Sequence, residues 1–231
     1  MHDKKIVNER LISSTVEITK EAGEAITEIY NSDFDYQLKK DLSPITAADN
    51  LSHNIIVERL ESLTPEIPIL SEENCDIPYK IRTQWTKYWL VDPLDGTKEF
   101  IKKNGEFTVN IALIEKDTPV FGVVYAPAID LLFWGSMQLG AWRKNAQESE
   151  KRISISTQTS KKIKIAGSRS HPSEKMKSFL SQFVDYELQP MGSSLKICLV
   201  ADGTVHLYPR LGPTMEWDTA AAHAILQSAG G

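Results

Sequence analysis

Two aspartates, Asp92 and Asp95, carry the strongest chemical signal in the chain. They lie in a segment that reads Trp89-Leu90-Val91-Asp92-Pro93-Leu94-Asp95-Gly96-Thr97. Residues 88–91 read as a buried strand, so Asp92 is predicted at its carboxyl end, which is where open α/β sheets bind ligands. Pro93 is expected to end that strand and force a turn. The spacing therefore predicts two carboxylates at a ligand-binding edge of a sheet.

The residues that follow, Gly96 and Thr97, are predicted to bind an anion. Glycine lets the backbone approach a ligand closely, and a short helix expected at 98–102 would present its unpaired N–H groups to that ligand. The plain alternative is a strand-to-helix turn in which the aspartates only cap the helix.

Three further acidic residues complete a candidate cluster. Glu72 follows a short strand-like run and so occupies another strand end, although with Glu73 it would by itself read as a solvated loop. Asp218 precedes an Ala-rich helix and by itself would be the N-cap of that helix. Asp49 closes a capping box with Thr46, which by itself also accounts for it.

Carboxylates that converge on one pocket repel one another unless cations neutralise them. A set of oxygen ligands without thiolates selects hard cations, with Mg2+ first and then Mn2+ or Ca2+. Two such ions about 3.5–4 Å apart would bind the attacking and leaving oxygens of a phosphoryl transfer. The acidic residues therefore predict a metal-dependent site for phosphate chemistry.

The composition is that of an ordinary globular protein of 231 residues with a formal net charge of -5. It offers no basic surface to a nucleic-acid polymer, so a phosphorylated ligand must be held by a local device. Cys75 and Cys198 lie far apart, which argues against a disulfide framework and favours a reducing compartment. With no signal-peptide pattern and no apolar run long enough for a bilayer, we expect no transmembrane segment and a cytoplasmic protein. The sequence leaves open the oligomeric state and peripheral association with the cytoplasmic face of the inner membrane.

These residues must be positioned by a mixed set of helices and strands. Helical spacing of apolar residues predicts a helix over 7–30 and another after Thr46. Strands are predicted at 34–38, 67–70, 88–91, 107–114, 120–125, 131–134 and 139–142. Beyond these, we expect strands at 163–166, 186–188 and 205–208 and helices at 173–183, 193–201 and 219–228.

The polar stretch 143–152 is the best candidate for a boundary between subdomains. We expect an N-terminal α+β subdomain at 1–147, which holds the metal-binding motifs, and a C-terminal α/β subdomain at 148–231. Because the chain ends just after a predicted helix, where one more strand is expected, the second subdomain is expected to be truncated at its end.

The motifs together resemble the Mg2+-dependent, lithium-sensitive phosphatase superfamily that includes inositol monophosphatase. Its signatures are matched by WxxDPxDGTxxF at 89–100, Glu-Glu at 72–73 and WDxAA at 217–221. Residues 41–49, 93–101 and 192–196 look closer still to one branch, the 3'(2'),5'-bisphosphate nucleotidases of the bacterial CysQ type. The resemblance spans essentially the whole chain and implies an α/β fold, a layered α-β-α-β-α sandwich.

The resemblance also implies a metal centre and its catalytic residues. It implies two or three Mg2+ ions, Mn2+ as a substitute, and inhibition by Li+ and Ca2+. The ligands it implies are Glu72, Asp92, the Leu94 carbonyl, Asp95 and Asp218. It further implies that Thr97, held by Asp49, orients the attacking water alongside Glu72. The backbone N–H groups of Gly96 and Thr97 would hold the scissile phosphate.

A second phosphate on the substrate would need donors of its own. Ser193, Ser194 and Lys196 are predicted near a helix start, where N–H groups and one cation suit an anion. An N-capping serine and a solvent-facing lysine would fit the same pattern. The other substrate-binding candidates are Lys98, Ser170, His171 and Arg210. No aromatic residue is assigned to stacking the adenine.

The expected function is hydrolysis of the 3'-phosphate of adenosine 3',5'-bisphosphate (PAP) to AMP and phosphate. A metal-activated water would do this without a covalent intermediate, in support of sulfate assimilation, and the sulfated relative of PAP is a further candidate substrate. An inositol monophosphatase-like phosphatase is the first alternative, because both branches share the acidic core. A metal-dependent nucleotide sensor, which binds without turnover, is the alternative that is not an enzyme.

Overall fold

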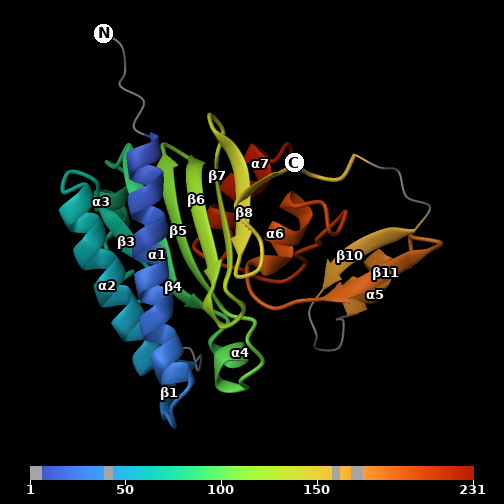
Figure 1. Ribbon diagram of the computed structural model, residues 1–231, viewed down its shortest axis with the longest axis horizontal. Coiled ribbons are helices and arrows are strands. Elements are labelled where there is room, and N and C mark those ends of the chain that lie inside the picture. Colours follow the sequence, from blue (N-terminus) through green and yellow to red (C-terminus); the bar gives the residue numbers. More distant parts are fainter. Residues whose placement is uncertain (1–6, 39–43, 158–161, 168–173) are drawn as a thin grey trace.

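The computed structural model describes residues 7–38, 44–157, 162–167 and 174–231. Its helices and sheets are stacked in layers (Figure 1). Helices α1 and α2 cover one face of a large sheet, α6 and α7 cover the other, and a small sheet with α5 beside it follows beyond α6. The predicted layered α/β sandwich is confirmed.

The large sheet has seven strands in the order β3-β4-β5-β6-β7-β8-β9. Their bounds are Ile69–Ser71 (β3), Lys87–Asp95 (β4), Thr108–Glu115 (β5), Thr118–Ala126 (β6), Leu131–Ser136 (β7), Gly140–Asn145 (β8) and Lys151–Ile153 (β9). Strands β3 and β4 run parallel, and each later pair of neighbours is antiparallel. The carboxyl ends of β3 and β4 therefore lie at the same edge, as the position of Glu72 near Asp92 requires.

Helices α1 (Glu9–Tyr30) and α2 (Ala47–Leu63) pack on one face of this sheet. The side chain of Asn8 caps α1, and the predicted capping box of Thr46 and Asp49 begins α2. Fully buried residues such as Ile26 and Leu60 join the helices to the apolar side chains of the sheet. Burial of this apolar surface is the main force that holds the layer in place.

The opposite face is covered by α6 (Leu195–Ala201) and α7 (Ala220–Ser228). Helix α7 is rich in alanine, and its backbone at Ala221 lies so close to Gly122 of β6 that a Cβ at position 122 would collide with it. Close packing of α7 on the sheet fixes the place of the residues that lead into the helix, among them Asp218.

The remaining elements are short. They are β1 (Tyr36–Leu38), β2 (Pro44–Thr46), α3 (Tyr79–Arg82), α4 (Thr97–Ile101), the 3-10 helix η1 (Pro127–Ile129), β10 (Ile163–Gly167), α5 (Glu174–Leu180) and β11 (Tyr186–Pro190). Strands β1 and β2 form an antiparallel pair, and β10 and β11 form the small parallel sheet.

Two expectations about the strands are wrong. Pro93 does not end β4, which runs on to Asp95 through an irregularity in its pairing with β5. Residues 205–208 form no strand, because their pairing is a single bridge between Leu207 and Ile165. In addition, β9 extends the large sheet past residue 147. The expected division into subdomains at 147/148 stays a prediction.

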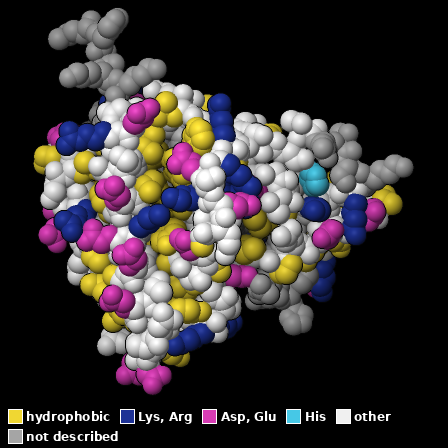
Figure 2. Space-filling model, viewed as in Figure 1, with side chains coloured by type: hydrophobic (Ala, Val, Ile, Leu, Met, Phe, Trp, Pro, Cys, Tyr) yellow, Lys and Arg dark blue, Asp and Glu magenta, His cyan; other side chains and the backbone are white. Residues whose placement is uncertain are grey.

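The face of the molecule in Figure 2 carries acidic and basic side chains interspersed with apolar ones. This mixture agrees with the modest formal charge of -5. Among the described residues, no helix has the length and apolar character needed to cross a membrane.

Candidate active site

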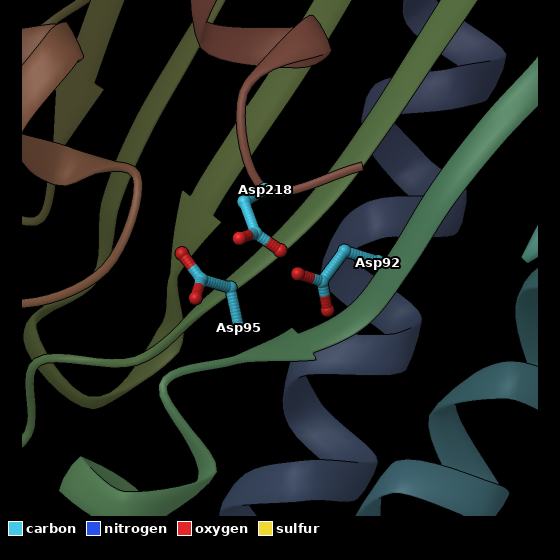
Figure 3. A group of neighbouring side chains, drawn as sticks. All are labelled: Asp92, Asp95 and Asp218. Atoms are coloured by element: carbon cyan, nitrogen blue, oxygen red, sulfur yellow. The ribbon is translucent and has the colours of Figure 1, made fainter. Parts of the chain in front are cut away.

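Three aspartates from two distant parts of the sequence form a cluster. Asp92 and Asp95 belong to β4, and Asp218 lies just before α7. Each offers a carboxylate oxygen within 4.8 Å of those of the other two, and Figure 3 shows the three side chains gathered side by side. Asp92 is buried, whereas Asp95 and Asp218 are partly exposed. A cluster of this kind, made only of oxygen ligands, fits a hard divalent cation.

The electrostatics of the cluster point to the same ligand. Burial raises the pKa of Asp92 well above its usual range, and the charges of Asp95, Glu72 and Asp218 raise it further. Burial, followed by the charge of Asp218, raises the pKa of Asp95 to about 7. Gathering these carboxylates is therefore unfavourable in the absence of a cation, and a divalent ion would remove that repulsion.

The irregular end of β4 directs its carboxylates into the cluster. Asp92 pairs with Asn110 of β5, the register then shifts, and pairing resumes at Asp95. Pro93, which has no N–H group to donate, falls within this β-bulge, where its missing hydrogen bond costs little. The Leu94 N–H donates to Oδ1 of Asp92 at 3.1 Å. A β-bulge within β4, rather than the expected turn after the strand, therefore orients the two carboxylates.

Gly96 links the bulge to α4. Its φ of 90° lies in the left-handed region, and a Cβ there would come within 3.1 Å of the Glu106 carbonyl oxygen. Glycine is therefore required at this position both for backbone conformation and for space. The turn places Thr97 as the first residue of α4.

Thr97 and Asp49 are joined as the resemblance implied. The Thr97 hydroxyl lies 3.2 Å from Oδ1 of Asp49 and 3.3 Å from the Leu94 carbonyl oxygen. The other carboxylate oxygen of Asp49 accepts hydrogen bonds from the N–H and the hydroxyl of Thr46, each at 2.7 Å. Asp49 therefore closes its capping box and contacts Thr97 at the same time.

Asp218 does not cap α7, so this interpretation of its sequence context is wrong. The N-cap of the helix is Thr219, which makes no side-chain capping bond. Oδ2 of Asp218 instead accepts hydrogen bonds from the Thr214 hydroxyl at 2.7 Å and the Met215 N–H at 3.1 Å. These bonds close the preceding loop and hold the carboxylate beside the other two aspartates.

The segment before α6 is bonded directly to the cluster. The Ser194 N–H donates to Oδ2 of Asp95 at 2.6 Å. The Ser194 hydroxyl lies 2.7 Å from Oδ1 of Asn110 and 2.9 Å from the hydroxyl of Thr108. Asn110 and Thr108 were not among the predicted site residues, because within β5 they read only as polar positions of a buried strand.

Lys196 is buried rather than solvent-facing, with 8% of its surface exposed. Its Nζ donates to the Ser193 carbonyl at 2.6 Å and lies 5.5 Å from the centre of the Tyr208 ring. Burial lowers the pKa of Lys196, and the charge of Asp95 counteracts that effect. A buried ammonium group next to a cleft is well suited to bind an anion.

Most of the predicted site residues line one cleft of about 710 Å³, whereas Asp49 lies behind Thr97 and is not part of its walls. Besides the three aspartates, its walls include the predicted residues Glu72, Leu94, Gly96, Thr97, Lys98, Ser193, Ser194, Lys196 and Arg210. Lys98 and Arg210 are exposed at its margin, and Arg210 donates to the Pro213 carbonyl at 2.7 Å. Ser170 and His171 lie outside the described residues. Tyr208 also lines the cleft. It was not predicted as a site residue, because a single tyrosine in an expected strand carries no signal for ligand binding.

Comparison with known proteins agrees with the geometry. The chain matches the model of the inositol monophosphatase family over residues 7–231. It is 47% identical to the 3'(2'),5'-bisphosphate nucleotidase CysQ of Salmonella typhimurium, covering 95% of this chain and 88% of that protein. It is 45% identical to the CysQ of Escherichia coli K12, with the same coverage of both chains.

A solved structure extends the comparison to the fold. The crystal structure of CysQ from Bacteroides thetaiotaomicron, a bacterial member of the inositol monophosphatase family, superposes with a TM-score of 0.86. The two chains share 38% identity, and the match covers 98% of this chain and 89% of the other. The chain therefore belongs to the inositol monophosphatase family.

Proposed function

We propose that this protein is a 3'(2'),5'-bisphosphate nucleotidase that removes the 3'-phosphate of PAP to give AMP and phosphate. The observation that carries the proposal is the arrangement of the cleft. The aspartate cluster suits cations that bind the scissile phosphate, and buried Lys196, which lines the same cleft, suits a second anionic group. Relatives at 45–47% identity bear the same enzyme name.

The metal centre of this proposal consists of Glu72, Asp92, the Leu94 carbonyl, Asp95 and Asp218. Two or three Mg2+ ions would bind there, with Mn2+ as a substitute, and we expect Li+ and Ca2+ to inhibit. Bound cations would supply charge for the phosphate oxygens and lower the pKa of water. Support comes from the oxygen-only donor set and from the raised pKa of Asp92 and of Asp95.

The attacking water would be oriented and deprotonated by three residues, namely Thr97, Asp49 and Glu72. Because Asp49 accepts the hydrogen bond of the Thr97 hydroxyl, the Thr97 oxygen can itself accept a hydrogen bond from water. Glu72, on the same cleft wall, would be the second acceptor. The backbone N–H groups of Gly96 and Thr97 would hold the scissile phosphate. Attack by water avoids a covalent enzyme intermediate.

Ser193 and Lys196 would bind the remaining phosphate. Ser193 has a φ of 46°, unusual for a residue other than glycine, and its buried hydroxyl lacks a hydrogen-bond partner among the described residues. Strained residues and unsatisfied buried polar atoms both gather at binding sites. Ser194, Lys98 and Arg210, together with Ser170 and His171, complete the proposed substrate contacts.

Phosphate release from PAP and from inositol 1-phosphate, each with Mg2+, tests the proposal. We expect turnover of PAP to be faster by at least about tenfold, since inositol 1-phosphate has no second phosphate for Lys196. Faster phosphate release from inositol 1-phosphate would support an inositol monophosphatase-like activity instead. Binding of PAP without turnover would support a nucleotide sensor. Parallel assays with Mn2+, Ca2+ and Li+ test the expected metals. A role in sulfate assimilation and a cytoplasmic location stay predictions.

A further inference from the structure

One face of α2 touches three separate segments of the proposed site, two of which carry or adjoin proposed metal ligands. Asp49, Ser52 and His53 are spaced by three and four residues and so share a face of the helix. Asp49 accepts from Thr97 at the start of α4. Ser52 Oγ donates to the Pro93 carbonyl of the β4 bulge at 2.8 Å. His53 Nδ1 lies 2.8 Å from Oγ of Ser71 at the end of β3.

The contacts of Ser52 and His53 fall directly beside ligand residues. Pro93 is flanked by Asp92 and Leu94, and Ser71 immediately precedes Glu72. Neither Ser52 nor Ser71 is appreciably exposed, with 0% and 1% of their surfaces open to solvent. Hydrogen bonds in such desolvated places are costly to leave unmade, so they restrict the groups that they join.

The β4 bulge needs such a restraint more than a regular strand would. Between Asp92 and Asp95 the pairing with β5 is interrupted, so the sheet itself does not fix the orientation of the Pro93 carbonyl. Ser52 is the described partner of this carbonyl. Through that bond, α2 sets the rotation of the backbone that presents Asp92 on one side and the Leu94 carbonyl on the other.

Helix α2 is itself anchored in the core, so it can hold the β4 bulge in one orientation. Ile56 and Leu60 continue the same face and are fully buried in the core. At the end of the helix, Thr64 Oγ1 accepts a hydrogen bond of 2.9 Å from the indole N–H of Trp89, which lies on β4. Hydrogen bonds therefore join α2 to β4 near both ends of the helix, through Ser52 and through Thr64.

We propose that Ser52 and His53 are positioning residues for a divalent-cation site, Ser52 acting on the Asp92–Leu94 bulge and His53 acting on Glu72. The inference rests on the metal centre of the proposed function and goes beyond it, because neither residue is a ligand. Loss of partners that orient metal ligands typically weakens metal binding by about 10- to 100-fold. A role limited to helix packing would instead lower stability and leave metal affinity unchanged.

The test is calorimetric titration of Mn2+ into the metal-free protein of 231 residues, without substrate. We expect the Kd for Mn2+ to rise about 10- to 100-fold in Ser52→Ala. Ser62→Ala is the matched control, because Ser62 lies on the same helix, is exposed and donates its hydroxyl hydrogen bond to the Glu58 carbonyl of that helix. Its Kd should equal that of the wild type. The unfolding temperature of each metal-free variant is measured alongside.

His53 provides an independent arm of the test in case Ser52→Ala does not fold. His53→Phe removes the contact with Ser71, whereas His53→Asn keeps a polar atom near the place of Nδ1. We expect weaker Mn2+ binding in His53→Phe and recovery of most of the affinity in His53→Asn. Wild-type affinity in the folded Ser52→Ala and His53→Phe variants, even with a lowered unfolding temperature, would overturn the positioning role.

The same titration separates this inference from the proposed function. If the wild-type protein binds no Mn2+, the metal centre itself is wrong, and the positioning role is overturned with it. If the wild type binds Mn2+ and hydrolyses PAP while the variants bind Mn2+ equally well, only the positioning role is overturned.

Discussion

The main-chain N–H of Ser194 donates a hydrogen bond of 2.6 Å to Oδ2 of Asp95, a residue 99 positions earlier in the chain. This bond joins the aspartate cluster to the segment that carries Ser193 and Lys196. The two halves of the proposed substrate site thus share one hydrogen bond. Substitution of Asp95 should therefore mainly weaken metal binding. Substitution of Lys196 should mainly weaken recognition of the second phosphate.

The substitution Asp95→Asn should remove most of the activity and leave the fold intact. It removes a charge from the cluster but little volume, and the amide oxygen can still accept from the Ser194 N–H. We expect kcat/KM for PAP to fall by at least about 100-fold, which is the upper end of what loss of an indirect metal contact costs. Circular dichroism and the unfolding temperature would check the fold.

Asp117→Asn is the control for this variant. Asp117 is exposed in the turn between β5 and β6, at the end of β5 opposite to the Thr108 that pairs with Asp95, and the same loss of charge there should leave turnover unchanged. Turnover near the wild-type rate in Asp95→Asn would contradict the metal cluster as the centre of catalysis.

The substitution Lys196→Ala should impair hydrolysis of PAP more than hydrolysis of 3'-AMP, which lacks the second phosphate. A hydrogen bond to a charged group contributes about 1.5–3 kcal/mol, so kcat/KM for PAP should fall by roughly 10- to 100-fold. Lys196→Met keeps most of the apolar volume of the side chain and should behave similarly. The readout is the ratio of kcat/KM for the two substrates.

Lys144→Ala, at an exposed position on β8, is the matched control for the loss of a lysine. Its ratio should equal that of the wild type. Equal losses on PAP and 3'-AMP in Lys196→Ala would mean that Lys196 supports the structure and does not recognise the second phosphate.

Much of the site could be predicted because its residues fall at strand and helix ends with strong local signals. The capping box of Thr46 and Asp49 and the strand before Asp92 follow from spacing and residue type, and the structure confirms both. The convergence of Asp218 on the same centre did not follow from spacing. Its local context predicted an N-cap, whereas the carboxylate bonds back to Thr214 and Met215 and meets Asp92 and Asp95 only in the folded protein.

The parts that could not be predicted depend on contacts between distant segments. Pro93 was expected to end β4, yet the strand runs on through a bulge in which the missing N–H costs little, and the Pro93 carbonyl is bonded by Ser52, 41 positions away. Asn110 and Ser194 likewise meet only in the folded protein, across 84 positions. No local pattern encodes such a pair, so propensity and periodicity cannot reveal it.

The Thr97 hydroxyl should matter for catalysis and not for the fold. Thr97→Val removes the group that bonds Asp49 and keeps the shape of the side chain, and we expect kcat to fall about 100- to 10,000-fold, the usual contribution of proton transfer by a positioned group. Thr97→Ser keeps the hydroxyl and should retain most of the activity. Equal activity of the valine and serine variants would rule out a role for this hydroxyl.

The pH dependence of stability should differ between the metal-free and the metal-bound protein. Burial and the charge of Asp218 raise the pKa of Asp95 to about 7 from 3.8. Between these values the folded metal-free protein binds more protons than the unfolded chain, so its free energy of unfolding should fall as pH rises from about 4 to about 7. Divalent cations compete with those protons, so their stabilising effect should grow over the same range.

Thermal unfolding at pH 5, 6, 7 and 8, with a chelator and with saturating Mg2+, measures this effect. The difference in unfolding temperature between the two conditions should widen as pH rises through the Asp95 pKa of about 7, because the ionised carboxylate then binds the metal without competition from its proton. In Asp95→Asn the metal-free protein should lose part of its pH dependence, since that residue no longer titrates. A difference that is the same at every pH would show that protonation of the cluster does not compete with the metal.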